Sequence, residues 1–511
     1  MTENNEQTSF DDLTNFTLSK ELITRLDEDF CRASGVVLLG SSPQEVSDIV
    51  SLGMIDLSDD QAVFEVERIV SRKIRRVQLN MFELEAALGF GFGDESADEG
   101  SVMTLDVGKG RLALAHDNEI EFTPDQSTAK MVCDALSQAV RLRASDIHIE
   151  VYASDIDLRF RIDGILAQQS TPFSKANIKK VCSYLRVLSD LDITERKAAQ
   201  DGRISTVYAD QSGDVRQIDM RICVLPGPHG PDVVLRILDE DRINISLDKL
   251  GLDDASYKTL KEIIKQPGGL VIVAGPTASG KTTTLYSAMR EINSDANKIL
   301  TVEDPIEYEI PKVNQKQVSM HMSFADYSRA FMRQNPDMLM IGEVRDEETA
   351  SAALRAAQMG HLVFTTLHAR DVPSALARLL VLCSDRSLAV SGLAGILSQR
   401  LVRRICPKCV EPYEPDPEML ARIASLPEDI SHVRGKGCSA CNNTGYKGQT
   451  GVFELLKFNG QLRSIVLRGD AIDLESVSGF RPMLGDAVEK LRAGVTTIEE
   501  ILRTVPLPDW A

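Results

Sequence analysis

The sequence lacks the features of a secreted or membrane-spanning protein. No apolar run approaches the roughly 20 residues that a membrane helix needs, and the first residues, MTENNEQTSFDD, lack the apolar core of a signal peptide. The nine cysteines are an odd number, which argues against a framework of disulfides. We therefore expect a protein of the reducing cytosol that associates with a membrane only indirectly, through a partner.

Positive charge is also in short supply. The 57 lysines and arginines are outnumbered by 76 aspartates and glutamates, so the net charge is −19. Such a chain is repelled by the phosphate backbone of nucleic acids, and we expect no nucleic-acid partner. The hydrophobic content of 43% permits sizeable cores, and 511 residues correspond to several domains.

One stretch carries a phosphate-binding motif. The apolar run 270–274 predicts a buried parallel strand that leads into GPTASGKT, a full match to G-x-x-x-x-G-K-[ST], and a helical pattern follows. In such a loop, backbone N–H groups close around phosphate oxygens at the positive end of a helix. The predicted nucleotide-binding residues of this stretch are Gly275, Pro276, Thr277, Ala278, Ser279, Gly280, Lys281, Thr282 and Thr283.

Two side chains of the motif have further predicted roles. Lys281 is expected to reach the β- and γ-phosphates of ATP, and the Thr282 hydroxyl is expected to bind Mg²⁺. A glycine-rich turn without a ligand is the alternative, and the strand and helix on either side of the motif argue against it.

Three further apolar stretches predict parallel strands that end in chemically reactive residues. They are 299–302, followed by Glu303-Asp304-Pro305-Ile306-Glu307; 338–341, followed by Gly342-Glu343; and 362–366, followed by Leu367-His368. Because ligands of α/β sheets collect at the carboxyl ends of the strands, we expect these residues to converge on the phosphate loop.

The reactive residues suggest roles in phosphoryl transfer to water. Glu343, directly after a strand, is where a water-orienting carboxylate belongs, but Gly342 replaces the usual aspartate before it. Glu307 is therefore the first candidate for support of Mg²⁺, and His368 for sensing of phosphate. Capping of a turn or helix remains the alternative for Glu303 and Asp304, as does a core or surface position for His368.

Five arginines are candidates for contacts with phosphate across a subunit interface; the alternative is a structural ion pair, or, for Arg221 on the polar face of its strand, simple solvation. They are Arg221, Arg236, Arg329, Arg333 and Arg345. Arg236 interrupts an apolar strand and therefore needs a partner.

A basic face is predicted in the first 88 residues. Ser58-Asp59-Asp60-Gln61 fits a capping box, and the apolar residues from Val63 to Val77 have helical spacing. The opposite face carries Arg68, Arg72, Lys73, Arg75 and Arg76. This face is either solvated or a contact surface.

Four cysteines form two C-x-x-C pairs. Cys406 and Cys409 are separated by 28 residues from Cys438 and Cys441. Two such knuckles suit tetrahedral Zn²⁺, and four thiolates leave no open position, which indicates a structural role. Free thiols or a redox pair are the alternatives.

Several of these motifs, in this order, resemble those of the assembly ATPases of type II secretion systems and type IV pili. They are GPTASGKTTTLY, TVEDPIE, RQNPDMLMIGEVRD, AAQMGHLVFTTLH, QRLVRRICPKC and CNNTGYKGQTGVFELL, and the match runs from about 126 to 460. The resemblance implies a hexameric, Mg²⁺-dependent ATPase on the cytoplasmic face of the bacterial inner membrane, docked on platform proteins through its N-terminal domain.

The resemblance also implies site residues. Glu307 matches the aspartate-box carboxylate, Glu343 the atypical Walker B glutamate and His368 the histidine-box residue. Arg221 and Arg236 match family arginines that reach the nucleotide from the second domain. With Lys281 they complete the predicted catalytic and nucleotide-binding set. The C-x-x-C pairs argue against a pilus retraction ATPase.

Together, pattern and resemblance predict a multidomain α/β fold of six segments. They are an N-terminal partner-docking α/β domain over 1–88, a linker over 89–122, a second α+β (PAS-like) domain over 123–242, a RecA-like P-loop ATPase domain over 243–405, a tetracysteine zinc module over 406–445 and a helical region over 446–511.

Three functions remain open at this point. The first is a motor for pseudopilus assembly and protein export, with the pilus-extension motor as its close alternative. The second is a nucleotide-binding scaffold without turnover, which the presence of Lys281, Thr282 and Glu343 argues against. The third is a DNA-translocating ATPase, which the acidic charge argues against.

Overall fold

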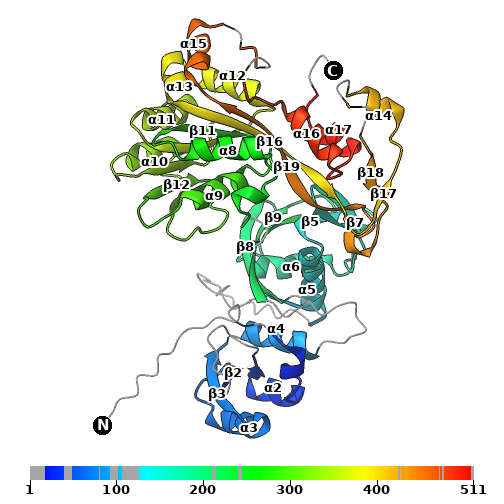
Figure 1. Ribbon diagram of the computed structural model, residues 1–511. Helices are drawn as coiled ribbons and strands as arrows, with labels where there is room; N and C mark the ends of the chain where they lie inside the picture. The colour runs from blue at the N-terminus through cyan, green and yellow to red at the C-terminus, as the bar shows by residue number, and fades with distance from the viewer. Residues whose placement is uncertain are drawn as a thin grey trace. The chain divides into compact units, whose positions relative to one another are not determined.

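The computed structural model divides the chain into two compact units, Met1–Asp239 and Glu240–Ala511 (Figure 1). It describes residues 16, 18–39, 49–79, 81–92, 102–105, 126–209, 215–239, 244–423, 426–427, 430–470, 472–474 and 477–507. The acidic start and most of the predicted linker lie outside these residues. Among the described helices, none has the length and apolar character needed to cross a membrane.

The first unit begins with a small α/β domain. Its sheet has the order β1-β2-β3, with β2 and β3 parallel, and its core contains residues of α1, α2, α3 and α4. The elements are α1 (Lys20–Ile23), α2 (Glu28–Ser34), β1 (Val36–Leu38), β2 (Ile49–Met54), α3 (Asp60–Val70), β3 (Lys73–Gln78) and α4 (Met81–Phe92).

The prediction that one helix extends from Val63 to Val77 with a basic opposite face is wrong. Helix α3 ends at Val70, where Ser71 takes a left-handed conformation with φ of 55°, and the residues beyond it form β3. Asp59, not Ser58, caps the helix, because its carboxylate accepts from the N–H groups of Gln61 and Ala62. The basic residues are therefore divided among the helix (Arg68), the turn (Arg72) and the edge strand β3 (Lys73, Arg75 and Arg76).

A seven-stranded sheet completes the first unit, with the order β4-β8-β9-β10-β5-β6-β7 and antiparallel pairing throughout. Its elements are β4 (Val102–Leu105), α5 (Gln126–Arg141), β5 (Ala144–Val151), β6 (Ile156–Ile162), β7 (Ile165–Gln169), α6 (Ile178–Leu188), β8 (Gln200–Ala209), β9 (Val215–Leu225) and β10 (Asp232–Leu238). The tight hairpin between β6 and β7 is confirmed, since Asp163 and Gly164 both have positive φ. Strand β4 lies inside the range predicted as a linker.

The second unit is built on a mostly parallel sheet with the order β13-β12-β14-β15-β11-β16-β19, in which only β19 is antiparallel. The strands are β11 (Gly269–Ala274), β12 (Ile299–Glu303), β13 (Asn314–Gln317), β14 (Met338–Ile341), β15 (Leu362–Leu367), β16 (Leu393–Ile405) and β19 (Tyr446–Lys457). The four predicted strands are confirmed. Strands β13, β16 and β19 were not predicted from the sequence, and β19 lies in the range predicted to be helical.

Helices cover both faces of this sheet. On one face, Leu270 and Ile272 pack with α10 (Phe324–Phe331), α11 (Glu347–Gln358), α12 (Val372–Leu382), α13 (Arg386–Gly392) and α15 (Gly460–Arg468). On the other, Val271 and Val273 pack with η2 (Leu247–Lys249), α8 (Asp254–Ile264) and α9 (Lys281–Ile292). Because both faces are buried, the strands read as continuous apolar runs.

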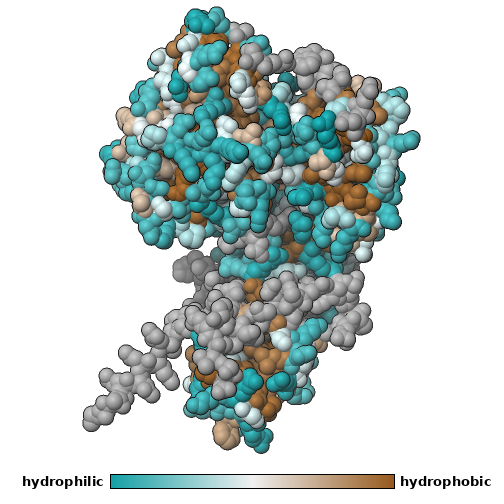
Figure 2. All heavy atoms as spheres, viewed as in Figure 1, coloured by the Kyte–Doolittle hydropathy of each residue, from teal (hydrophilic) through white to brown (hydrophobic). Residues whose placement is uncertain are grey.

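The remaining elements are β17 (Val410–Pro412), α14 (Pro417–Ala421), β18 (Val433–Gly435), η3 (Ser439–Cys441), α16 (Met483–Arg492) and α17 (Ile498–Thr504). Of these elements, α14, α16 and α17 form a satellite core against β16 and β19. Hydrophilic side chains cover most of the visible face of the second unit in Figure 2, with smaller apolar areas between them.

Candidate active site

The phosphate loop joins β11 to α9 in the second unit. Gly280 is the N-cap of α9 with φ of 87°, a left-handed conformation that glycine adopts without strain. A Cβ on Gly275 would collide with the Ser279 hydroxyl and would lie 2.8 Å from the Gln399 carbonyl oxygen. Both glycines of the motif are therefore required by the local geometry, and the loop meets the N-terminus of α9, as an anion site requires.

Lys281 folds back over the loop. Its Nζ donates to the carbonyl oxygens of Gly275 at 2.9 Å and Pro276 at 2.8 Å. Burial lowers the pKa of Lys281 to about 8, although Glu343 acts in the opposite direction. The ammonium is thus held beside the loop by two backbone carbonyl oxygens, which a phosphate could replace as acceptors.

Glu343 and His368 meet at the ends of the neighbouring strands β14 and β15. The distance from His368 Nε2 to Glu343 Oε2 is 3.6 Å, and Glu343 Oε1 forms an ion pair with Arg345. Burial, and then the charge of Lys281, lower the pKa of His368. The predicted convergence of these strand ends is thus present for Glu343 and His368.

The close packing around Gly342 explains why this position has no aspartate. Its N–H donates to the Val302 carbonyl at 2.8 Å, and its own carbonyl accepts from the Thr366 hydroxyl at 2.7 Å. A Cβ at this position would lie 3.2 Å from the Val302 oxygen and 3.3 Å from the Phe324 ring. The backbone is therefore packed too tightly between strands and helix to carry a side chain without a shift.

Glu303 is buried in a structural network. Its carboxylate accepts from the Thr301 hydroxyl at 2.7 Å, from Gln315 Nε2 at 3.0 Å and from the Tyr286 hydroxyl. These donors occupy both oxygens, so the side chain ties β12 to α9 and β13. Asp304 lies 3.7 Å from Arg345, and Glu307 follows in the same loop.

Arg236, Arg329 and Arg345 make ion pairs within the units where they lie. Arg329 pairs with Asp326 at 2.7 Å and Glu348 at 3.6 Å, and the Arg333 guanidinium donates to the Arg329 carbonyl. The partner that Arg236 needs is Asp146, with 3.1 Å between Nε and Oδ1.

Arg221 stands directly across from Arg236 in the first unit, and Arg203 stands across from Arg221. The three guanidinium groups therefore lie on one face of the sheet, on β8, β9 and β10. Arg203 was not among the predicted site residues, because only the strand pairing reveals that it lies beside Arg221.

The four cysteines converge, as predicted. All four sulfurs lie within 4.8 Å of one another, and the Cys406–Cys438, Cys409–Cys441 and Cys438–Cys441 distances are 3.9, 3.9 and 3.7 Å. Tetrahedral coordination at a Zn–S distance of about 2.3 Å separates sulfurs by about 3.8 Å, so the cluster fits Zn²⁺. The Cys438 N–H also points at the Cys441 sulfur at 3.2 Å.

Gln399 and Arg400 of β16 are residues near the loop that the sequence analysis missed. Gln399 is 1% exposed and hydrogen-bonds to both the loop and α9. Arg400 donates to the carbonyls of Gln399 and Arg370. The only signal was their position in QRLVRR, and nothing in that pattern indicates a contact with the phosphate loop.

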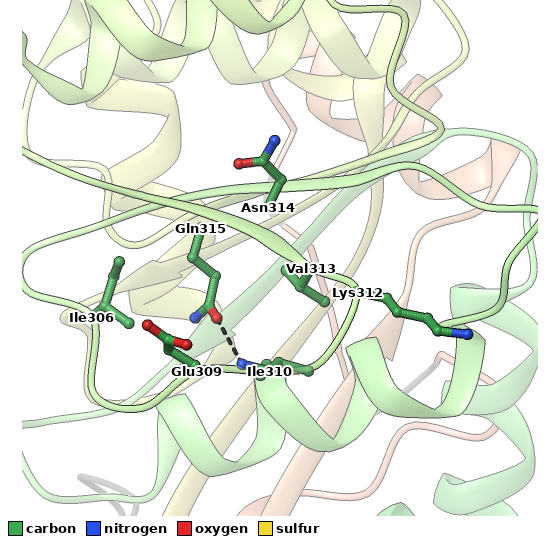
Figure 3. Close-up of a pocket in the computed structure, with 7 residues that line it drawn as sticks. All are labelled: Ile306, Glu309, Ile310, Lys312, Val313, Asn314 and Gln315. Carbon is green, nitrogen blue, oxygen red and sulfur yellow. Dashed lines mark hydrogen bonds between the residues drawn. The ribbon is translucent and has the colours of Figure 1, made fainter. Parts of the chain in front are cut away.

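A separate pocket of about 480 Å³ lies beside the edge strand β13 (Figure 3). Gln315 lines it and accepts from the Ile310 N–H at 2.7 Å, while its amide nitrogen reaches Glu303. Figure 3 shows Lys312 and Glu309 on the same loop. None of the predicted site residues lines this pocket.

Strand β11, the glycine loop and α9, set in a doubly wound sheet, define the P-loop class of α/β protein. Within this class, residues 121–503 match the family described as "Type II/IV secretion system protein", and the chain belongs to that family.

Two relatives are similar over much of their length. "Type II secretion system ATPase E" of Vibrio cholerae is 35% identical over 498 residues, which cover 95% of this chain and 97% of the relative. "Type IV pilus assembly ATPase PilB" of Myxococcus xanthus is 38% identical over 396 residues, which cover 76% and 69%.

Solved structures share the mixed α/β multidomain fold. The pilus retraction motor PilT with bound ADP has a TM-score of 0.51 at 26% identity, covering 74% of this chain and 98% of that one. The ATPase DotB of Legionella pneumophila has a TM-score of 0.55 at 24% identity, covering 76% and 98%, which supports the fold alone.

Proposed function

We propose that this chain is a Mg²⁺-dependent ATPase that works as a cytoplasmic homo-hexamer and powers pseudopilus assembly and protein export by a type II secretion system. The observation that carries the proposal is the meeting of Glu343 and His368 beside Lys281, in a chain of this family. A scaffold without turnover would not need all three groups in one place.

The roles follow from the chemistry of phosphoryl transfer. Lys281 and the N–H groups of 275–283 hold the phosphates, and the Thr282 hydroxyl offers a ligand for Mg²⁺. The bound ion would neutralise charge on the phosphates. Glu343 orients the attacking water, and neutral His368 donates or accepts a hydrogen bond beside it. Glu307 supports the ion in place of the usual aspartate before Glu343, a position that Gly342 occupies in this chain.

We assign the remaining site residues by charge and family resemblance. Arg221 and Arg236 contact the nucleotide from the second domain, whose fold we propose to be PAS-like, and the P-loop domain is RecA-like. Cys406, Cys409, Cys438 and Cys441 hold a structural Zn²⁺, which cross-links the two knuckles. The N-terminal domain docks on inner-membrane platform proteins, so that the hexamer is peripheral on the cytoplasmic face.

Extension of a type IV pilus is the second candidate. It is favoured by the similarity to the pilus assembly ATPase of Myxococcus xanthus, although the aligned part covers a smaller share of both chains. The two candidates share the same chemistry and differ in the fibre that is assembled.

A complementation experiment in the native host separates the candidates. A strain without the gene receives either the wild-type chain or Glu343→Gln, and secreted proteins in the medium and pili on the surface are measured. We expect the variant to leave secreted proteins in the periplasm with pili unchanged. Lost pili with normal secretion would favour the second candidate, and normal levels of both would contradict the proposal.

A further inference from the structure

We propose that Gln399 is a positioning residue for nucleotide binding, which holds the phosphate loop in its binding conformation without touching the nucleotide. Gln399 lies on β16, one residue after Ser398, which pairs with Ala274 at the end of β11. It therefore stands beside the point where the loop begins. The inference rests on the proposed ATP site.

The two ends of the Gln399 amide hold two different segments. Nε2 donates to the Ser279 carbonyl at 2.7 Å, and Oε1 accepts from the Thr284 hydroxyl at 2.8 Å. Gln399 is 1% exposed and Thr284 2%, so water does not compete for these bonds. Only a side chain with a donor and an acceptor on one rigid plane can make both contacts.

The bond to Ser279 has a consequence for anion binding. A carbonyl oxygen turned toward a phosphate would repel it, whereas a loop whose carbonyls are held elsewhere presents its N–H groups. Gln399 also fills the space under the loop, because a Cβ on Gly280 would lie 3.1 Å from its Nε2. The loop is therefore fixed from below before phosphate arrives, which lowers the ordering cost of binding.

The same strand reaches the segment after His368. Arg400 donates to the Gln399 carbonyl at 3.0 Å and to the Arg370 carbonyl at 2.8 Å. The dipeptide Gln399-Arg400 thus connects the phosphate loop with the turn between His368 and α12.

The test measures binding of a fluorescent ATP analogue with Mg²⁺ to the full chain and to three variants. Gln399→Met removes both hydrogen bonds at similar volume. Gln399→Glu keeps the acceptor and carries a donor only when the carboxyl is protonated. Ser398→Ala is the matched control, because Ser398 is equally buried and its hydroxyl has no hydrogen-bond partner within the described residues.

We expect Gln399→Met to weaken binding roughly tenfold and Ser398→Ala to leave it unchanged. Gln399→Glu should bind poorly at pH 8 and recover toward the wild type at pH 6, because a buried carboxyl has a raised pKa. The charged groups around this position are Lys281, Arg400, and the carboxylates of Asp371 and Glu454, which act on Arg400. All the proteins share these groups, so each affinity is divided by the wild-type value at the same pH.

A general loss of packing would affect Gln399→Met and Gln399→Glu alike at both pH values. Binding of Gln399→Met within about twofold of the wild type, or no recovery of Gln399→Glu at pH 6, would overturn the inference. A wild-type chain that does not bind the analogue would instead overturn the proposed ATP site itself.

Discussion

The Nε2 atom of His368 lies 3.6 Å from Oε2 of Glu343. The two side chains closely follow the ends of the adjacent parallel strands β14 and β15, so the pairing of these strands brings them together. Burial and Lys281 keep the pKa of His368 below its usual range, and the imidazole is neutral near pH 7. A neutral ring can donate a hydrogen bond to the Glu343 carboxylate without bringing a positive charge to that carboxylate.

Replacement of His368 tests this pairing. We expect His368→Gln to reduce the rate of ATP hydrolysis about 100-fold while ATP binding is kept, because the ring lies beside Glu343, the carboxylate proposed to orient water. His361→Gln is the control, since His361 lies just before the other end of the same strand β15. Equal rates for the two variants would remove His368 from the mechanism.

The pH dependence of ATP affinity should report on Lys281, whose pKa is lowered to about 8. At pH 7 the amine is already charged, and binding needs no proton. Above pH 8 the free protein has lost that proton and must take it up to bind phosphate, so affinity should fall by up to about tenfold per pH unit. Titration calorimetry in buffers of different ionisation enthalpy measures this uptake. Constant affinity from pH 7 to 9 would contradict it.

Glu303 should affect stability rather than chemistry. Glu303→Ala leaves the Tyr286 and Thr301 hydroxyls and the Gln315 amide without their acceptor, and we expect a loss of about 3 kcal/mol in the free energy of unfolding. ATP affinity should remain close to that of the wild type. The exposed Glu309 of the following loop provides the control substitution, which should change stability little. Denaturant unfolding gives the numbers, and equal stability of both variants would refute the network.

Metal analysis tests the cysteine cluster. The wild-type chain should contain one Zn²⁺, and Cys438→Ser should contain almost none and unfold at a lower temperature, because loss of a ligand removes binding energy that also stabilises the fold. Cys383→Ser, which changes a buried cysteine outside the cluster, should keep the metal. A folded wild-type chain without stoichiometric zinc would contradict the assignment.

The parts predicted correctly from the sequence depend on short-range patterns. Strand β11 was predictable because both of its faces are buried, which gives an uninterrupted apolar run. The cysteine cluster was predictable because each C-x-x-C pair is a local signal and two such pairs satisfy one metal. Strand β16 was not predictable, since Gln399 and Arg400 interrupt it with polar groups whose partners lie more than 20 residues away.

In the N-terminal domain, the sequence pattern predicted a helix that is longer than the one in the structure. Ile74 and Val77 continue the helical spacing of α3, but Ser71 ends the helix with a left-handed conformation, and the chain pairs with β2 instead. Spacing alone could not reveal this, because residues at i and i+4, such as Val70 and Ile74, share a face in a helix and in a strand alike. The pairing with β2 decided the outcome.

The rate of ATP hydrolysis by the purified protein with Mg²⁺ decides whether the proposed site turns over. Glu343→Gln removes the charge that we propose orients water while it keeps the size of the side chain, and Glu309→Gln is the matched control. The account predicts steady hydrolysis by the wild type and the control, and a rate at least about 100-fold lower for Glu343→Gln with ATP still bound. Equal rates for the wild type and Glu343→Gln would contradict it.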